Sequence, residues 1–504
     1  MVFNSYVFIF LMLPISIAGY YLINKLSCKG GQIFLLFSSL VFIGYMNTAY
    51  LLVLIPSVLI NYLIIYMMNH AFKTKVGHRK VLMISGIVFN VLLLAVFKYC
   101  DFFIDNINVI FKKDIAFLHL LMPLGISFYT FKQISVLADY HKDDNLSCTL
   151  LEYGIYMTFY PQFTQGPIVL QSEFMPQLRD HERKKWDSVY ASKGLCRFTL
   201  GLAKKVLIAD TIAKAVDGGY EELAEVNALG ALVLILGYTL QIYFDFSGYS
   251  DMAIGLGNLF HIDLPENFDS PYKARSIDEF WDRWHITLTR FFTRYVYIPM
   301  GGSRKGEVRT YVNVFIVFLL SGLWHGAEWS FVIWGALHGV AMLISRMIRE
   351  KAKNPVKKAE SRITGILKNV GIFVYVSIAW VFFRARDTKE AIEVITKVFL
   401  GGFDNMTEYI YEMFNKTVEI SWLLRLDALG LEDKLGGMIL ILVLIVLILI
   451  CMLAPNSRQM TENWQDKVTV SVRGYAVSII ITGLLFAWCV LSLSGVTSYV
   501  YWNF

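Results

Sequence analysis

The sequence predicts an all-α, polytopic membrane protein, and its composition and the spacing of its apolar stretches are the observations behind this prediction. Of the 504 residues, 56% are hydrophobic and 17% are charged, and the mean hydropathy is +0.52. Soluble domains carry about 25% charged residues. The low charge therefore predicts a chain that lies largely in lipid.

Apolar stretches recur along the chain at a length that suits a hydrocarbon core. A helix needs about 20 apolar residues to cross about 30 Å of hydrocarbon. The expected spans are 5–24, 32–46, 48–68, 81–98, 226–245, 311–324, 329–347, 366–385, 437–455 and 473–495. We therefore expect a body of many helices.

Two apolar segments, 120–133 and 159–170, carry Pro and Gly and predict short, broken or re-entrant helices. At membrane depth, irregular backbone is tolerated only where it is buried in protein or lines a cavity. These segments predict helices arranged around a central tunnel. We expect one integral-membrane domain over 1–504, with a motif-rich core at about 155–345 and C-terminal spans and a tail over 366–504.

The first apolar segment lacks a basic n-region and a small-residue cleavage site, so it predicts a retained span. Basic residues gather at 25–29, 73–80, 183–185, 273–309 and 346–362. The positive-inside rule places these segments in the cytoplasm and both termini outside. Because the basic residues form no single stripe, the net charge of +6 does not predict nucleic-acid binding.

The cysteine pattern predicts neither disulfides nor a metal site, since no CxxC or other ligand spacing occurs. P-loop, GxGxxG, GxSxG and HExxH motifs are absent from the sequence, as is an internal repeat of the transporter type. We therefore expect no permanently bound cofactor. The dispersed cysteines are Cys28, Cys100, Cys148, Cys196, Cys451 and Cys489.

Two tryptophan–histidine pairs in apolar surroundings point to chemistry. Trp284-His285 lies in FWDRWHITLTRFF and Trp324-His325 in FLLSGLWHGAEWSFVIWG. Imidazole exchanges protons near neutral pH, and an ionisable group in hydrocarbon is costly without a task. The pairs predict proton transfer inside a membrane.

The first pair is expected on one amphipathic helix along the cytoplasmic side. Ser276 and Glu279 form a capping-box pattern. Apolar residues then recur at helical spacing as far as Tyr295, with His285 on or beside the apolar face. A buried structural histidine, bonded to a neighbouring helix, is the alternative for His285.

The second pair is expected at membrane depth, since Tyr311 to His325 is shorter than a full hydrocarbon core. Gly322 and Gly326 would let backbone or substrate approach closely. We interpret His338, on a different helix face, as structural.

Basic residues near the first pair have two interpretations. Arg304 and Lys305 in the loop MGGSRKG, together with Arg290 and Arg294, suit the phosphates of a coenzyme. They equally suit a positive-inside anchor for the next span.

Four motifs in order carry a family resemblance: YPQFTQGPIVLQSEFMPQL, FDFSGYSDMAIGLG, EFWDRWHITLTRFFTRYVYIPMGGSRKG and SGLWHGAEWSFVIWGALHG. The chain resembles the membrane-bound O-acyltransferase family, in particular its bacterial alginate O-acetyltransferase branch. The resemblance implies a multi-pass enzyme of the bacterial cytoplasmic membrane. It also implies that His285 and His325 are the functional histidines, with His325 at the catalytic position.

The resemblance further implies a reaction and its partners. An acyl group, acetyl in this branch, would leave a cytoplasmic thioester such as acetyl-CoA and cross the membrane to O-acetylate an extracytoplasmic polysaccharide, with a hydrolase-like partner protein. His325 would act as general base, or would activate an intermediate nucleophile. Tyr501, in the aromatic C-terminus, matches a tyrosine that would relay the acyl group; an aromatic belt is the alternative.

Three other functions stay open at this point. The chain could transfer D-alanine from a carrier protein to teichoic acid, could be an envelope transporter without a covalent step, or could be a silent scaffold. The sequence does not distinguish alginate, cellulose or a wall polymer as acceptor.

Overall fold

The computed structural model describes residues 1–351, 361–402, 410, 432–462, 472–493 and 499. Within these residues the regular structure is helical, apart from an isolated antiparallel bridge between Phe268 and Trp284. The all-α prediction is therefore confirmed. The chain forms two compact units, Met1–Phe198 with Met252–Glu266, and Thr199–Asp251 with Asn267–Phe504.

Eight helices among the described residues are long and apolar enough to cross a membrane, which confirms a multi-pass protein. They are Phe8–Leu26, Cys28–Met46, Ala49–Asn69, Val76–Phe111, Ala228–Leu259, Glu307–His325, Trp329–Glu350 and Arg362–Arg384. Shorter apolar helices at Gly437–Leu453 and Ala476–Leu491 correspond to the last two expected spans.

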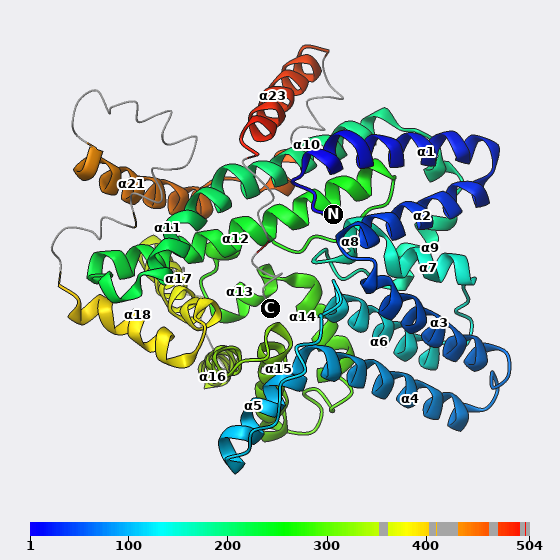
Figure 1. Ribbon diagram of the computed structural model, residues 1–504, viewed down its shortest axis with the longest axis horizontal. Coiled ribbons are helices and arrows are strands. Elements are labelled where there is room, and N and C mark those ends of the chain that lie inside the picture. The colour runs from blue at the N-terminus through cyan, green and yellow to red at the C-terminus, as the bar shows by residue number, and fades with distance from the viewer. Residues whose placement is uncertain (352–360, 403–409, 411–431, 463–471, 494–498, 500–504) are drawn as a thin grey trace. The chain divides into compact units, whose positions relative to one another are not determined.

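The first unit holds the N-terminal helices (Figure 1). They are α1 (Leu13–Leu26), α2 (Cys28–Met46), α3 (Ala49–Asn69), α4 (Val76–Leu94), α5 (Cys100–Phe111), α6 (Ile126–Lys142), α7 (Leu150–Thr158), α8 (Tyr160–Phe163) and α9 (Gln171–Arg179). α10 (Ser188–Ala203) and α12 (Ala228–Leu259) contribute residues to both units.

The two segments with Pro and Gly do interrupt the helices of the first unit. α6 starts directly after Gly125, whose φ of +71° suits glycine. After the four residues of α8, the chain is non-helical until α9 begins at Gln171. This irregular stretch is buried, so protein atoms surround its backbone.

Two hydrogen bonds between buried polar side chains join neighbouring helices of the first unit. Ser57 of α3 donates a hydrogen bond of 3.1 Å to Gln133 of α6. Asn61 of α3 donates one of 3.2 Å to Asn90 of α4. Such bonds tie neighbouring helices together where lipid offers no partner.

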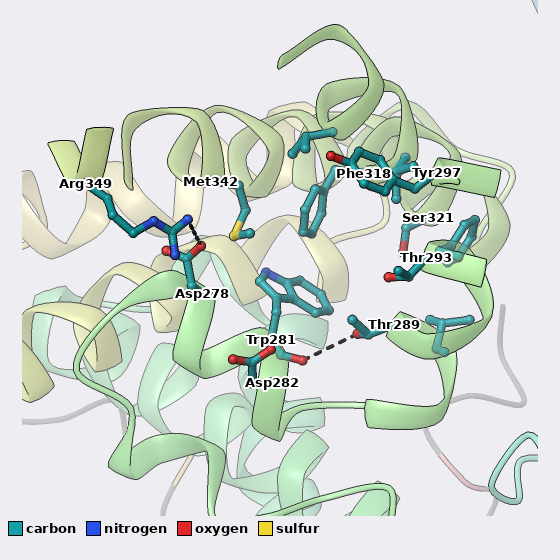
Figure 2. A pocket seen from close by; sticks show the side chains of 14 residues that line it. Asp278, Trp281, Asp282, Thr289, Thr293, Tyr297, Phe318, Ser321, Met342 and Arg349 are labelled. Carbon is teal, nitrogen blue, oxygen red and sulfur yellow. Dashed lines mark hydrogen bonds and ion pairs between the residues drawn. The ribbon is translucent and has the colours of Figure 1, made fainter. Parts of the chain in front are cut away.

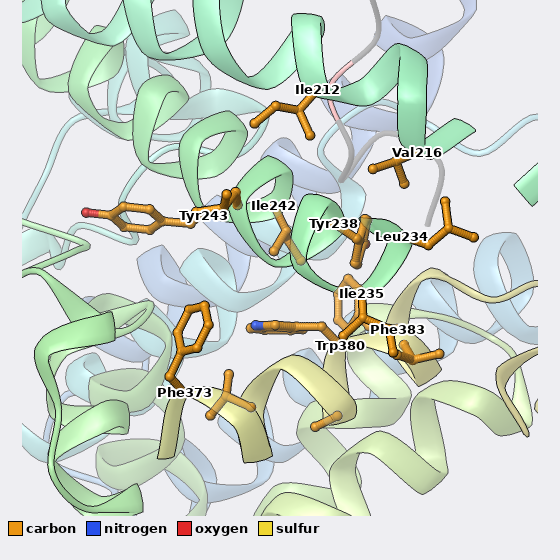
Figure 3. Packing of buried hydrophobic residues seen from close by; sticks show 14 of the residues in the cluster. Ile212, Val216, Leu234, Ile235, Tyr238, Ile242, Tyr243, Phe373, Trp380 and Phe383 are labelled. Carbon is orange, nitrogen blue, oxygen red and sulfur yellow. The ribbon is translucent and has the colours of Figure 1, made fainter. Parts of the chain in front are cut away.

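The second unit contains the motif-rich helices. They are α11 (Asp210–Glu221), α13 (Ile277–Arg283), α14 (Ile286–Phe292), α15 (Glu307–His325), α16 (Trp329–Lys351), α17 (Arg362–Arg384), α18 (Thr388–Leu400), α21 (Glu432–Leu453) and α23 (Val472–Leu491). Figure 3 shows Phe373 and Trp380 of α17 facing α12 side chains such as Ile242 in its apolar core.

α15 and α16 pack with their backbones close together. A Cβ atom on Gly322 would lie 2.3 Å from the carbonyl oxygen of Phe331 and 3.2 Å from the Cα atom of Gly335. Of the two expected reasons for Gly322, close approach of backbone is therefore the observed one. This packing fixes the end of α15, where His325 lies.

Candidate active site

The helix expected after Ser276 is broken at the first Trp–His pair, so the prediction of one continuous helix was wrong. α13 ends at Arg283, and α14 begins at Ile286. His285 between them has a left-handed backbone with φ +45°. A non-glycine residue in this region is strained by about 1–3 kcal/mol and persists only where its surroundings impose it.

Backbone hydrogen bonds from a distant segment impose this break. The N–H of Ile286 donates to the carbonyl of Asn267 at 3.0 Å, and the N–H of Asp269 donates to the carbonyl of Arg283 at 2.9 Å. These bonds replace the helical bonds that a continuous helix would make across His285.

The predicted capping box is confirmed in one half only. The Ser276 hydroxyl accepts from the N–H of Glu279 at 3.1 Å. The Glu279 carboxylate instead accepts from the N–H of Arg275 at 2.8 Å. The Ser276 cap sets the start of α13, because it satisfies an N–H group that the first turn leaves unpaired.

Asn267 fixes the tautomer of His285. Its Oδ1 accepts from the N–H of Thr287 at 3.3 Å and from the Thr287 hydroxyl at 2.8 Å, while its Nδ2 donates to Ser250 at 3.3 Å. The oxygen therefore faces His285, whose Nδ1 lies 3.1 Å away and must be the donor. Nε2 keeps its lone pair and has no hydrogen-bond partner among the described residues.

His285 is held neutral by its burial. Its exposed fraction is 1%, and burial lowers the pKa of the imidazole to about 3. Desolvation disfavours the charged form of histidine. A neutral ring with one fixed N–H offers a permanent acceptor nitrogen.

His325 lies beside His285 at the C-terminal end of α15. The centroids of the two imidazole rings are 6.4 Å apart. Trp334 and Phe383 contact His325 edge to face, with centroid distances of 5.2 Å and 5.1 Å. The structure thus brings together the two histidines that the sequence singled out, in one aromatic enclosure.

A mostly apolar cavity of about 340 Å³ lies between α13, α14, α15 and α16 (Figure 2). Trp281, Phe318 and Met342 form its apolar wall, and the ion pair of Arg349 with Asp278, 3.0 Å long, closes one side. Neither of the two candidate histidines lines it. Ser321, one helical turn before His325, does. The cavity therefore lies close to the histidine pair.

The four basic candidates differ in their exposure. Arg304 and Lys305 are exposed in the loop after the π-helical turn Thr293–Tyr297. Arg290 and Arg294 are partly buried, and the Arg294 guanidinium lies 5.4 Å from the Tyr295 ring centroid. The loop glycines Gly301, Gly302 and Gly306 have φ values of +109°, +54° and +89°.

The remaining residues that the sequence analysis considered are Tyr501, His338 and the cysteines. Tyr501 lies outside the described residues. His338 is fully buried among aromatic rings. All six cysteines are free. Among the described residues, no group of three or more His, Cys, Asp or Glu side chains is suited to a metal ion.

Asn267 is a site residue that the sequence did not reveal. It lies in the loop between α12 and α13, within PENFDSPYK. An asparagine in a loop with Pro and Ser ordinarily predicts a turn, and no spacing relates it to His285. Only the fold shows that it holds the histidine.

Comparisons with known proteins identify the family of this chain. A family model described as MBOAT, membrane-bound O-acyltransferase family, matches residues 147–385. The chain is 38% identical to the peptidoglycan O-acetyltransferase of Helicobacter pylori over 422 residues, which cover 78% of this chain and 79% of that protein.

Two further relatives have different named activities. The probable alginate O-acetylase AlgI of Pseudomonas aeruginosa is 36% identical over 416 residues, with 81% of this chain and 76% of that protein covered. The teichoic acid D-alanyltransferase of Bacillus subtilis is 28% identical over 283 residues, with 53% of this chain and 70% of that protein covered. The similarity to O-acetyltransferases supports an enzyme, in place of a transporter without a covalent step or a silent scaffold. This chain belongs to the membrane-bound O-acyltransferase family and is an O-acyltransferase.

Proposed function

We propose that this protein transfers an acetyl group from a cytoplasmic thioester such as acetyl-CoA, across the membrane, for O-acetylation of an extracytoplasmic polysaccharide. The observation that carries the proposal is the buried His285–His325 pair, with ring centroids 6.4 Å apart. The relatives named for O-acetyl transfer to peptidoglycan and alginate support the acetyl group and the polysaccharide.

His325 is the proposed general base. Its imidazole takes the proton of an attacking hydroxyl, the oxygen bonds to the thioester carbonyl carbon, and the carbon–sulfur bond breaks. The proton then passes to the leaving thiolate, so the histidine returns to its neutral form. Proton transfer of this kind contributes about 10²–10⁴-fold to a rate.

The position of His325 on its helix supports this role. It is the last residue of the 19-residue helix α15. Unpaired carbonyls give a helix C-terminus a partial negative charge, which favours a cation there by about 0.3–1 kcal/mol, or up to about 2 kcal/mol when partly buried. The helix end therefore stabilises the imidazolium formed during transfer.

His285 is the proposed orienting residue. Its Nδ1–H is committed to Asn267, which leaves Nε2 as an acceptor. A hydroxyl that donates to Nε2 is held in one orientation. Holding reactants in a reactive geometry is a large part of enzymatic rate enhancement.

The cavity beside the histidines suits the acyl end of the donor. Its wall of Trp281, Phe318 and Met342 is apolar, and a methyl or alkyl chain gains free energy by leaving water. Arg290, Arg294, Arg304 and Lys305 are the proposed contacts for the donor phosphates. The donor is a substrate, so the proposal requires no permanently bound cofactor.

Transfer across the bilayer requires a route and a recipient. We propose a central tunnel in a bacterial cytoplasmic membrane, with both termini on the extracytoplasmic side. Tyr501 would accept the acyl group there and present it to a hydrolase-like partner protein. Neither coenzyme A nor a polysaccharide crosses hydrocarbon readily, because each carries many polar groups.

A second candidate is D-alanyl transfer from a carrier protein to teichoic acid. The similarity to the teichoic acid D-alanyltransferase of Bacillus subtilis, at 28% identity, favours it. The chemistry at His325 would be the same, since both donors are thioesters. The two candidates differ in the donor and in the acceptor polymer.

Labelled donors test the proposal directly. Membranes with the full chain, or with His325→Ala at matched abundance, receive labelled acetyl-CoA or a carrier protein loaded with labelled D-alanine, and the polysaccharide fraction is counted. We expect acetyl label for the wild type and at least about 100-fold less for the variant. Label from D-alanine alone would establish the second candidate, and equal acetyl label in both proteins would refute the role of His325.

A further inference from the structure

Residues 245–251 of α12 hold the histidine site from one side. The ring of Phe246 meets the His285 ring edge to face, at a centroid distance of 4.8 Å. The Ser250 hydroxyl accepts a hydrogen bond of 3.3 Å from Asn267, the residue that fixes the His285 tautomer. The position of this stretch therefore sets the position of the His285 ring.

An acidic residue adjoins each of these two contacts. Asp245 directly precedes Phe246, and Asp251 directly follows Ser250. Both acidic residues are buried, with exposed fractions of 1% and 4%. Carboxylates are almost never fully buried unless they are paired. The partners of these two carboxylates therefore bear directly on the site.

The partners are neighbouring lysines of the π-helical turn Lys204–Ala209. Lys205 Nζ lies 2.6 Å from Asp245, and Lys204 Nζ lies 2.6 Å from Asp251. The two aspartates are six residues apart, so at about 100° per residue they lie on faces of α12 about 120° apart. The two lysines thus hold α12 from two sides.

Lys205 is the more deeply buried lysine, with an exposed fraction of 1%. Its Nζ also lies 2.8 Å from Asp210. Burial alone would lower the pKa of Lys205, but Asp245 and Asp210 raise it above its ordinary value. The ammonium is therefore charged inside the protein, where salt screens its ion pairs much less than at the surface.

The backbone of the turn also packs directly on α12, between the two aspartates. A Cβ atom on Gly248 would lie 2.8 Å from the carbonyl oxygen of Gly201 and 3.2 Å from the backbone nitrogen of Lys205. Glycine permits this close approach because it has no side chain. Two ion pairs and one backbone contact thus fix the turn on this stretch of α12.

We propose that Lys205 is a positioning residue for acyl transfer: together with Lys204 it holds residues 245–251 of α12, and through Phe246 and Ser250 it fixes the orientation of the His285 imidazole. The effect on the rate rests on the proposed function, whereas the orientation of His285 is a property of the folded protein. A misplacement of about 1 Å in a reacting group costs about 100-fold in rate.

Three variants of the full chain separate the ion pair from simple packing. Lys205→Arg keeps the charge, and Lys205→Met removes it. Lys205→Met/Asp245→Asn also removes the carboxylate that would otherwise stay buried without its ammonium. Arg179→Met is the control, because it breaks an ion pair of 2.7 Å with Glu152 in the first unit. The Tm in detergent identifies any variant that fails to fold.

Two readouts are measured for each variant. The first is kcat and KM for acetyl-CoA. The second is hydrogen–deuterium exchange at ring carbon C2 of His285, read by mass spectrometry, which depends on the access of water to the ring and requires no acetyl transfer. Exchange at His338, which is buried in the same unit, is the internal reference. A general loosening of the core would speed exchange at both histidines.

We expect Lys205→Arg and Arg179→Met to resemble the wild type in both readouts. Lys205→Met and the double variant should exchange faster at His285 but not at His338, and should lose up to about 100-fold in kcat with KM unchanged. The double variant should recover Tm without recovering kcat, because it removes the buried lone charge but does not restore the ion pair.

Three results would overturn the inference: unchanged exchange at His285 in Lys205→Met, an equal increase at His338, or a kcat that recovers together with Tm in the double variant. A wild-type protein that transfers no acetyl group would instead refute the proposed function. In that case the exchange at His285 and His338 would still decide whether Lys205 positions the ring.

Discussion

His285 and His338 are both buried in the second unit among aromatic rings, but they are held in opposite ways. Their exposed fractions are 1% and 0%. His285 donates to Asn267 and sits in a strained left-handed backbone. His338 lies inside α16, and both of its ring nitrogens lack a hydrogen-bond partner among the described residues.

The rings around His338 give it contact without polar recognition. Trp281 and Trp334 meet it edge to face, at centroid distances of 5.0 Å and 4.9 Å. A ring held only by packing has no fixed tautomer, whereas Asn267 fixes that of His285. Burial therefore does not distinguish the two histidines, whereas a fixed tautomer with an unpartnered acceptor nitrogen does, and this difference is why we propose a functional role for His285 and none for His338.

The largest effect is expected from removing the acceptor nitrogen of His285. His285→Ala should lower acetyl transfer by about 10²–10⁴-fold, because the nucleophile loses its orienting partner. The initial rate with labelled acetyl-CoA measures the loss. If the variant keeps more than a tenth of the wild-type rate, His285 does not orient the attacking hydroxyl.

A smaller loss is expected from removing the residue that holds His285. Asn267→Ala leaves Nδ1 unpaired and frees the ring to turn, and a misplacement of about 1 Å costs about 100-fold in rate. The unpaired group also costs about 1–3 kcal/mol of stability. Rate and Tm are measured together, with Ser250→Ala as control, since that substitution leaves the Asn267–His285 bond in place. An unchanged rate in Asn267→Ala would show that acyl transfer does not depend on the His285 tautomer that Asn267 fixes.

The loss of stability on lowering the pH should show that His285 is neutral in the folded protein. Burial lowers its pKa from 6.5 to about 3 in the folded protein, so the unfolded chain binds more protons between these values. Stability from this group is full above pH 6.5 and falls by about 1.4 kcal/mol per pH unit below it. His285→Gln should therefore lose less Tm than the wild type between pH 7 and pH 5. An equal loss would mean that His285 is not buried as a neutral ring.

The smallest effect is expected at His338. His338→Phe keeps an aromatic ring and removes two nitrogens that have no hydrogen-bond partner among the described residues. Relief of their desolvation, about 1–3 kcal/mol, offsets the cost of fitting the larger phenyl ring into the core. We expect less than about a tenfold change in rate. A larger loss at unchanged Tm would show that His338 takes part in the reaction as well.

The membrane helices were predictable because their signal is local. Each apolar stretch carries its own length and composition, and even the interruption at Gly125 is marked by a glycine that adopts φ +71°. The two functional-histidine candidates were also visible, since each follows a tryptophan in an apolar run. Their proximity was not, because it depends on how α14 and α15 meet.

The break at His285 could not be predicted, because its cause lies elsewhere in the chain. Histidine carries no helix-breaking signal of the strength of proline, and the apolar spacing from Ile277 to Tyr295 continues through it. The bonds that break the helix come from Asn267 and Asp269.

We propose that the pair of His285 and His325, and not the aromatic enclosure as such, carries acyl transfer. The most direct measurement compares acetyl transfer by His325→Ala and His338→Phe in the same membranes at equal abundance and equal Tm. We predict that the first loses about 10²–10⁴-fold and the second less than about tenfold. Similar losses in both variants, or none in His325→Ala, would contradict the claim.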